Sequence, residues 1–265
     1  AMQAYDANPS DEPQQAERER REAGERAGKA PWWVEYAVSF FPVILFVFML
    51  RSFVVEPFRI PSGSMLPTLE SGDLILVNKF NYGIRLPIVD KKVVDIGKPA
   101  RGDVIVFRYP VDTDVDYIKR VIGLPGDRIQ MIDNVLFING TAVRDVEMSR
   151  QDVQNLYGTQ LTIQLRETLP EGREINVQDW GPGNISDNTP VFEVPAGHYF
   201  MIGDNRDNSQ DSRYDQSAGV GYVPAENLIG KAEIILFSWK PGASLWNPVS
   251  WFSKVRPSRF FTVLN

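Results

Sequence analysis

An uncharged apolar stretch near the N-terminus most constrains how this chain can fold. The stretch covers residues 36–50 (YAVSFFPVILFVFML) and is extended by apolar flanks. Its fifteen residues rise about 22 Å as a helix, which is short of the roughly 30 Å hydrocarbon core of a bilayer. Snorkelling by Arg51 and interfacial Trp32 and Trp33 make up the difference. We predict a transmembrane helix over residues 31–55, and a buried core helix is the alternative that length alone permits.

Basic residues ahead of this stretch set the expected orientation. Residues 1–30 are polar, without a sustained apolar period, and their basic residues are Arg18, Arg20, Arg21, Arg26 and Lys29. Positively charged flanks of a span stay in the cytoplasm, and acidic residues count little in this rule. We therefore expect residues 1–30 to be a cytoplasmic tail, with a single span in this sequence. Everything after about residue 56 should lie outside.

The composition excludes several classes of function. A net charge of -6 and a pI near 5.0 argue against a nucleic-acid partner, which needs a basic footprint. The chain has no cysteine and only one histidine, His198, so thiol nucleophiles and His-rich metal clusters are excluded. Asp112, Asp114 and Asp116 open like a calcium-binding loop, but Tyr117 stands where that loop needs glycine. We expect no metal and no other cofactor.

Beyond residue 56 the chain is predicted to be mainly β. Short runs rich in β-branched and aromatic residues, bounded by Gly, Pro or Asp, predict strands; they cover residues 73–80, 103–109, 117–123, 198–204 and 231–239. Residues 135–143 carry Asn139-Gly between apolar runs, which is a strong hairpin signal. His198 opens one of the runs, so we expect it to be a strand residue.

The body is expected to divide into a core, an insertion and a C-terminal segment. Between residues 131 and 196 the apolar runs weaken and loops are expected to lengthen, which indicates a smaller inserted β subdomain. Residues 56–130 and 197–240 would then form the two parts of one core. In residues 241–265 aromatic and basic residues alternate. This pattern suits either a membrane surface or a tail packed on the domain; the residues are Trp246, Trp251, Phe252, Lys254, Arg256, Arg259, Phe260 and Phe261.

Two serines directly after the apolar stretch raise the question of chemistry. Ser62 and Ser64 lie in RIPSGSMLPTLESGD, residues 59–73, and such a sequence is most often only a turn. A serine becomes a nucleophile when a base removes its proton. Because His198 lies in an apolar run, lysine remains as the base, provided that its pKa falls from about 10.4 toward 7–8. Lys119, in the strand-like run DVDYIKRVIGLPGD, is the candidate, although a strand lysine is usually solvated.

A third cluster follows an apolar run later in the chain. Residues 203–213 (GDNRDNSQDSR) concentrate Asp, Asn, Arg and Ser. The composition of an ordinary surface loop is more often distributed among Lys, Glu and Gly. These side chains orient one another by hydrogen bonds, as the surroundings of a catalytic site do.

Together these segments resemble the bacterial type I signal peptidases (leader peptidases), the Ser/Lys serine proteases that remove signal peptides. The resemblance rests on EPFRIPSGSMLPTL, GDLILVNKF, RGDVIVF, DYIKRVIGLPGD and GDNRDNSQDSR, which occur in the order of the family's motifs. It implies an antiparallel β-sheet catalytic core (signal-peptidase/LexA-like) with an inserted smaller β subdomain, preceded by an N-terminal transmembrane helix. It also implies the bacterial inner (cytoplasmic) membrane as location, with the catalytic domain on the periplasmic side.

The resemblance assigns roles to individual residues. Ser64 matches the nucleophile and Lys119 the general base, and the Ser62 hydroxyl with the Ser64 backbone N–H would form the oxyanion hole. Ser209 matches a serine that hydrogen-bonds and orients the lysine. Further matches in the same segment are a supporting ion pair, Asp211 with Arg213, and a glycine that lets the loop approach the lysine, Gly203.

Apolar residues match the family's shallow substrate pockets, which accept small residues in the Ala-x-Ala pattern. These residues are Phe58, Ile60, Pro61, Met65, Leu69, Ile75, Val106, Tyr117 and Ile118. The implied partners are signal-peptide-bearing preproteins, the phospholipid membrane and, indirectly, the secretion translocon.

Two other readings compete with the peptidase. A self-cleaving repressor of the LexA type shares the Ser/Lys chemistry, but it needs a DNA-binding module, which the apolar stretch at residues 36–50 does not fit. A membrane-anchored, non-catalytic β-domain for binding or assembly is the alternative from another class.

Overall fold

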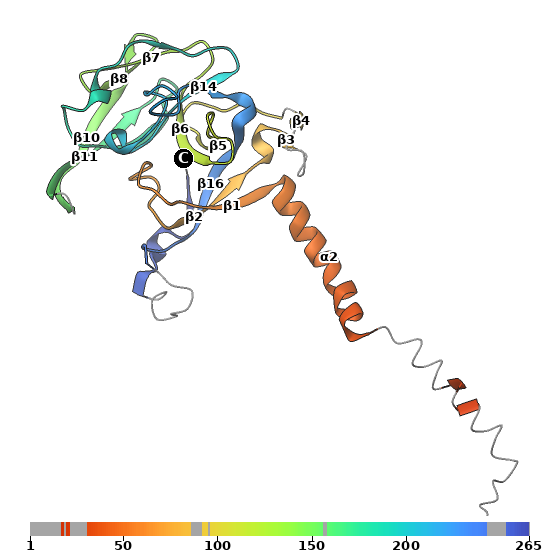
Figure 1. The fold of residues 1–265 in the computed structure, drawn as a ribbon. Coiled ribbons are helices and arrows are strands. Elements are labelled where there is room, and N and C mark those ends of the chain that lie inside the picture. The colour runs from red at the N-terminus through yellow and green to blue at the C-terminus, as the bar shows by residue number, and fades with distance from the viewer. Residues whose placement is uncertain are drawn as a thin grey trace, which may run out of the picture. The chain divides into compact units, whose positions relative to one another are not determined.

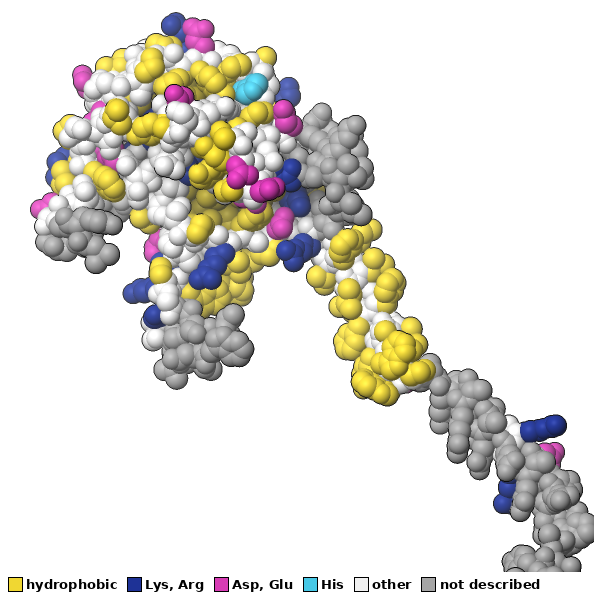
Figure 2. Space-filling view, viewed as in Figure 1, with side chains coloured by type: hydrophobic (Ala, Val, Ile, Leu, Met, Phe, Trp, Pro, Cys, Tyr) yellow, Lys and Arg dark blue, Asp and Glu magenta, His cyan; other side chains and the backbone are white. Residues whose placement is uncertain are grey.

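The computed structural model contains one helix with the length and composition to cross a membrane among the residues it describes. Those residues are 17–18, 20–21, 31–85, 92–94, 96–155, 158–242 and 253–264 (Figure 1). Helix α2 covers Trp32–Phe53, and its window Trp32–Met49 has a mean hydropathy of 1.7 and no buried residue. Figure 2 shows hydrophobic side chains over the visible surface of this helix. The length and composition of this helix fit the predicted membrane span.

The helix ends two residues before the predicted boundary, because Val55 already begins strand β1. The predicted cytoplasmic tail, residues 1–30, lies outside the described residues except for short helical pieces at 17–18 and 20–21.

The body is built on an antiparallel sheet in the order β1-β2-β16-β5-β6-β14-β15, and β17 pairs with β16. All pairs in this path are antiparallel. The strands are β1 (Val55–Arg59), β2 (Asp73–Asn78), β5 (Val104–Arg108), β6 (Asp116–Gly123), β14 (His198–Ile202), β15 (Val223–Pro224), β16 (Leu228–Ser238) and β17 (Thr262–Val263). The five strands predicted from the apolar runs are therefore present with shifted ends, and His198 is a strand residue as expected.

Both faces of the central strands are covered, which explains why their sequences read as continuous apolar runs. In β5, Val104 and Val106 belong to one buried cluster, whereas Ile105 and Phe107 belong to another. Successive side chains of a strand point to opposite faces, so the alternation assigns one cluster to each face of the sheet.

Two smaller sheets lie at one end of the body, where Figure 1 shows β7, β8, β10 and β11. Their orders are β13-β7-β8-β9 and β10-β11-β12, and β3 pairs with β4 elsewhere. The strands are β3 (Ile84–Arg85), β4 (Lys92–Val94), β7 (Arg128–Ile132), β8 (Val135–Ile138), β9 (Thr141–Ala142), β10 (Arg144–Asn155), β11 (Gly158–Thr168), β12 (Glu174–Asp179) and β13 (Phe192–Glu193). The predicted hairpin is confirmed: Asn139 and Gly140 both have positive φ between β8 and β9.

The prediction of lengthened loops between residues 131 and 196 is wrong in part. Strands β10 and β11 pair along a long hairpin, and β12 occupies six residues of a segment expected to be loop. Strand β10 is an edge strand whose sequence, RDVEMSRQDVQN, is largely polar. Because both of its faces are mostly exposed, it lacks the apolar alternation by which a half-buried strand is recognised.

Buried contacts connect the β10-β11-β12 sheet to the segment 203–213. The Gln178 N–H donates to the Asp204 carbonyl at 2.8 Å. Glu167 on β11 accepts two hydrogen bonds from the Arg206 guanidinium, both of 2.6 Å, and both side chains are buried. The position of the loop therefore depends on this sheet.

The C-terminal segment packs on the main sheet. Residues 262–263 form β17 against β16, and Leu264 belongs to the buried cluster that includes Ile75 and Val106. Phe261 and Val263 remain exposed. Three of the aromatic residues noted above, Trp246, Trp251 and Phe252, lie outside the described residues.

Replacing Glu167 with Gln is expected to lower the free energy of unfolding by about 3 kcal/mol, because it leaves the Arg206 charge buried without its counter-charge. Chemical denaturation measures the change. The exposed pair of Arg166 and Glu174 supplies the control, since Glu174→Gln should cost less than about 1 kcal/mol. Equal effects of the two changes would show that the buried pair contributes no more than a surface pair.

Candidate active site

Ser62 and Ser64 lie in residues 60–73, which comprise the connection between β1 and β2 and the first residue of β2; we term this segment the active-site loop. The Ile60 N–H donates to the Asp73 carbonyl and the Gly72 N–H to the Ile60 carbonyl, both at 2.8 Å. These bonds close the loop at its base. Ser64 is buried, whereas Ser62 is exposed, and their Oγ atoms are 3.4 Å apart.

Lys119 reaches Ser64 from strand β6. Its Nζ donates to Ser64 Oγ at 2.8 Å and to the Ile118 carbonyl at 3.0 Å, and the residue is only 2% exposed. The Tyr117 ring, on the same face of the strand, has its centroid 5.5 Å from Nζ. The two residues proposed from sequence as nucleophile and base are thus in hydrogen-bond contact.

Burial is the main influence on the titration of Lys119. It lowers the pKa of this ammonium from 10.5 to about 8, and Arg213 acts in the same direction, while the carboxylates of Asp211 and Asp204 oppose the shift. A buried ammonium loses its hydration, which favours the neutral form. With a pKa of about 8, about a tenth of Lys119 is neutral at pH 7, far more than for an ordinary lysine, and a base must be neutral to accept a proton.

The segment 203–213 holds the backbone of the active-site loop through Asn205. The Asn205 N–H donates to the Ser64 carbonyl at 3.0 Å, and Asn205 Nδ2 donates to the Gly63 carbonyl at 2.9 Å. Asn205 was not among the site residues expected from sequence. Its place in the cluster GDNRDNSQDSR was a signal, but many polar side chains in that cluster were equally eligible.

Asp211 and Arg213 form a buried bidentate ion pair, with two N–O contacts of 2.9 Å. Burial alone would raise the pKa of the Asp211 carboxyl, but the adjacent Arg213 charge, together with hydrogen bonds from Arg213 and the Gly203 N–H, holds that pKa below its usual range. Asp211 Oδ2 also accepts from the Gly203 N–H at 3.0 Å. The pair therefore fixes the start of the segment that contains Asn205.

Gly203 and Ser209 differ from their expected arrangement. A Cβ at Gly203 would lie 2.2 Å from Ser209 Oγ and 2.6 Å from the Ser64 carbonyl oxygen. The nearest atoms that require glycine here thus belong to Ser209 and to the Ser64 backbone. Ser209 Oγ is buried and makes no hydrogen bond of good geometry among the described residues, although it lies near enough to the Asp211 carboxylate to help lower its pKa. The expected bond between Ser209 and Lys119 is not formed.

A cavity of about 640 Å³ opens beside these groups. Ser62, Ser64, Lys119 and Ser209 all line it. Its wall also includes residues that sequence reasoning did not select, among them Val115, Asp116, Asn208, Gln210, Tyr214 and Ala218. Several come from loops without an apolar pattern, so only the tertiary structure identifies them.

The residues expected to form substrate pockets separate into two groups. Pro61, Tyr117 and Ile118 line the cavity. The others lie in the buried cluster behind it, or in the case of Phe58 pack against that cluster: Phe58, Ile60, Met65, Leu69, Ile75 and Val106. The second group supports the wall, and the described cavity does not expose it.

Arg120 is also part of this region. It follows Lys119 on β6, is buried, and donates from Nε and Nη2 to the two carboxylate oxygens of Asp204 at 2.8 and 2.7 Å.

Within the described residues, no group of three or more His, Cys, Asp or Glu side chains is arranged to hold a metal ion.

A buried serine in contact with a buried lysine, at the wall of an open cavity, is the arrangement expected of a nucleophile and its base. Comparison with known proteins agrees with this geometry. The family described as signal peptidase, peptidase S26, matches residues 33–239.

Individual relatives are similar over most of this chain. Signal peptidase I of Pseudomonas fluorescens is 50% identical over 228 residues, which cover 81% of this chain and 76% of that protein. Signal peptidase I of Pseudomonas aeruginosa is 48% identical with the same coverage. Signal peptidase I of Rickettsia typhi is 40% identical and covers 84% of this chain and 90% of that protein. The chain belongs to the S26 family of signal peptidases.

Replacing Lys119 with Met is expected to raise the free energy of unfolding at pH 7 by about 3 kcal/mol, because it removes the cost of burying an ammonium. Between about 8 and 10.5 the folded parent binds fewer protons than the unfolded chain, so the stability of the parent rises with pH. The advantage of the variant should therefore shrink across that window. Denaturant titrations at several pH values measure both quantities, and Lys240→Met, at an exposed position, is the control. An advantage independent of pH would contradict the burial argument.

Proposed function

We propose that the protein is a membrane-bound serine endopeptidase that cleaves signal peptides from exported preproteins after small-x-small sites. The observation that carries the proposal is the 2.8 Å contact between Lys119 Nζ and Ser64 Oγ inside a chain of the S26 family. The lowered pKa of Lys119 supports its role as base.

In the proposed mechanism Lys119 is neutral when substrate binds. Ser64 Oγ attacks the scissile carbonyl carbon while Lys119 Nζ takes its proton. The Ser64 N–H and the Ser62 hydroxyl donate to the oxyanion, a contribution of about 3 kcal/mol per donor in comparable sites. The tetrahedral intermediate then collapses: the C–N bond breaks, and Lys119 returns the proton to the leaving amine.

The second half releases the signal peptide from the enzyme. Lys119, neutral again, removes a proton from a water molecule that attacks the acyl carbon. The ester bond to Ser64 breaks, and Lys119 protonates Ser64 Oγ. One amine thus transfers protons in both halves, which is consistent with a pKa near neutrality.

The side chains at the cavity support a preference for small residues. Pro61, Tyr117 and Ile118 supply apolar surface next to the nucleophile, and the packed cluster behind them resists displacement by a bulky side chain. An apolar substrate segment would also cover Lys119 and exclude water, which favours its neutral form.

The apolar helix supports a location at the membrane. A signal peptide keeps its own apolar segment in the bilayer, so an enzyme anchored by α2 meets the cleavage point at a high effective concentration. The basic residues that precede α2 support a cytoplasmic N-terminus and a catalytic domain on the periplasmic side of the inner membrane. Contact with the secretion translocon would then be indirect, through the shared preprotein.

The domain organisation follows the same proposal. Residues 56–130 and 197–240 would form the catalytic core, and residues 131–196 the inserted subdomain. The contacts of Glu167 and Gln178 with the segment 203–213 support a positioning role for the insertion.

Replacing Ser64 or Lys119 with Ala should each abolish cleavage of a preprotein with an Ala-x-Ala site, because one change removes the attacking oxygen and the other its base. Cleavage is followed by gel shift with the full chain in detergent or lipid. Circular dichroism verifies that each variant is folded, and turnover near the parent rate in either folded variant would reject the dyad.

The pH dependence of kcat/KM should reflect the titration of Lys119. The neutral amine is the active form, so kcat/KM is expected to rise about tenfold per pH unit below pH 8 and to level off above it. Initial rates between pH 5 and 10, with stability verified at each pH, test this. A profile without an ionisation between pH 7 and 9 would assign the base to another group.

A further inference from the structure

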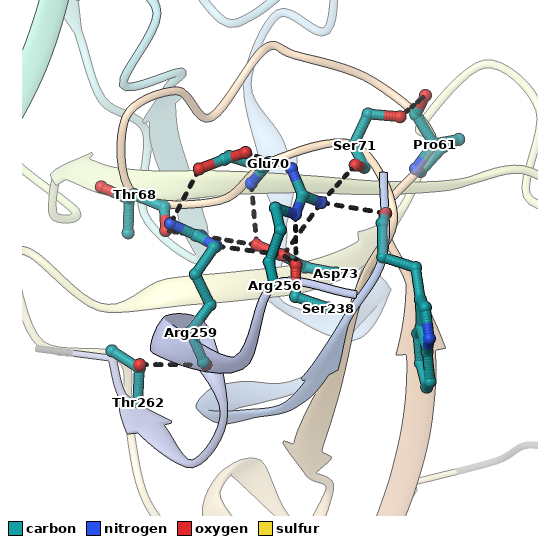
Figure 3. Close-up of polar contacts among 10 residues, drawn as sticks. Pro61, Thr68, Glu70, Ser71, Asp73, Ser238, Arg256, Arg259 and Thr262 are labelled. Carbon is teal, nitrogen blue, oxygen red and sulfur yellow. Dashed lines mark hydrogen bonds and ion pairs between the residues drawn. The ribbon is translucent and has the colours of Figure 1, made fainter. Parts of the chain in front are cut away.

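Two arginines from the C-terminal segment lie at the base of the active-site loop. Figure 3 shows Arg256 and Arg259 directed toward Glu70, Ser71 and Asp73, the residues that end the loop. Arg256 directly precedes the 3-10 helix η5 (Pro257–Arg259), and Arg259 is its last residue. The segment is thus joined to the loop by charged groups, although the two are far apart in sequence.

Asp73 is the centre of these contacts and is completely buried. Its carboxylate accepts from Arg259 Nη2 at 2.6 Å, from Arg259 Nε at 3.2 Å and from Ser238 Oγ at 2.5 Å. Arg256 Nε donates to Ser238 Oγ at 2.7 Å, and Arg256 also pairs with Glu70. A buried carboxylate needs such partners, since burying it alone is strongly unfavourable.

Contacts of Arg256 connect this cluster to the residues proposed to form the oxyanion hole. Its Nη2 donates to the Ser71 carbonyl at 2.7 Å and to the Trp239 carbonyl at 3.0 Å. The Ser71 hydroxyl donates to the Pro61 carbonyl at 3.1 Å, and Pro61 directly precedes Ser62. Three steps therefore connect the guanidinium to the residue proposed as oxyanion donor.

Close packing at Gly72 joins the active-site loop to Trp239, which directly follows β16. Gly72 has a φ of +95°, and a Cβ there would lie 1.8 Å from the Trp239 carbonyl oxygen. Arg256 bonds to that oxygen and to the adjacent Ser71 carbonyl. A planar guanidinium has several donors in a fixed geometry, so it holds the two carbonyls at a defined separation.

The position of the Ser62 side chain depends more on the contacts at the base of the active-site loop than the position of Ser64 does. Asn205 holds the Ser64 carbonyl and Lys119 contacts the Ser64 hydroxyl, so Ser64 is fixed from two other segments. The Ser62 side chain is exposed, and its described hydrogen-bond contact is the 3.4 Å approach to Ser64 Oγ. The backbone on either side of Ser62 is held at Gly63 by Asn205 and at Pro61 by Ser71, so the contact at Pro61 is the one through which the base of the loop acts on the Ser62 hydroxyl.

We propose that Arg256 is a positioning residue that acts through Ser71 and Pro61 to place the Ser62 hydroxyl in the oxyanion hole. The inference rests on the proposed function, because it assumes that Ser62 stabilises the oxyanion. In this proposal the C-terminal segment affects turnover through its hydrogen bonds to the active-site loop, and it needs no contact with the substrate or the membrane.

A double-mutant cycle between Arg256 and Ser62 tests the proposal. Preprotein cleavage by the full chain in lipid is measured for the parent, Ser62→Ala, Arg256→Gln and the double variant. Ser62→Ala should lower kcat about a hundredfold, as loss of one oxyanion donor does. Arg256→Gln should lower kcat about tenfold with KM unchanged, because it misplaces that donor without removing it. In the Ser62→Ala background, Arg256→Gln should change kcat by less than about twofold.

Ser71→Ala provides an independent variant, because it removes the bond to Pro61 but keeps every ion pair. It should lower kcat in the parent and have no further effect after Ser62→Ala, and it serves where Arg256→Gln fails to fold. Arg256→Lys, which keeps the charge but not the fork, should recover only part of the loss. The control is Arg150→Gln, an arginine in an exposed pair with Glu147 on β10, and its kcat should equal that of the parent.

Other outcomes overturn the inference. Equal fold-losses from Arg256→Gln with and without Ser62 would reduce Arg256 to a structural role, and so would a change confined to KM. If Ser64→Ala abolishes cleavage and the effects of Arg256→Gln and Ser62→Ala on kcat are additive, the proposed function stands and this inference fails. Normal turnover in Ser64→Ala would reject the proposed function itself, and normal turnover in Ser62→Ala would remove Ser62 from the oxyanion hole and end the inference with it.

Discussion

The site depends on one lysine that is buried in the sheet without a counter-charge in hydrogen-bond contact. Lys119 Nζ bonds to a hydroxyl and a carbonyl, Ser64 Oγ and Ile118 O, and neither group carries a charge. The negative charge of Asp211 is largely compensated by Arg213, with which it forms a bidentate pair. Desolvation therefore dominates, and the pKa of Lys119 falls to about 8. If Asp211 had no arginine partner, its uncompensated negative charge would favour the charged form of Lys119.

Burial of this kind requires a rigid surrounding, since a loosely packed lysine would reach water by rotation of its side chain. The surrounding segments are tied by buried charge pairs: Arg120 with Asp204, Arg206 with Glu167, and Arg213 with Asp211. Such pairs contribute little net stability compared with apolar packing. Their fixed geometry holds the loop 203–213 against the Ser64 backbone, which is the feature that the chemistry needs.

Three distant parts of the chain meet around the active-site loop. Asn205 bonds to its carbonyls at Gly63 and Ser64, β6 supplies Lys119, and the C-terminal segment closes the base through Asp73. Ile60, Met65 and Leu69 anchor the loop in the buried cluster, whereas the exposed part at Ser62 has little apolar surface of its own and depends on neighbouring segments. This explains how the loop can hold two hydroxyls in defined positions.

The sequence by itself determined the main elements: the apolar helix, the strands of the core sheet and the Asn139-Gly140 hairpin. It also singled out Ser64 and Lys119, which the structure brings into contact. Each has a local signal, either a period of side chains or a motif. The tertiary structure alone decided what depends on contacts between distant segments. It revealed the polar edge strand β10, placed Met65, Leu69 and Ile75 in a buried cluster rather than on the cavity wall, and left Ser209 without a hydrogen bond to Lys119. Burial and hydrogen-bond partners arise only when the chain has folded, so no local pattern encodes them.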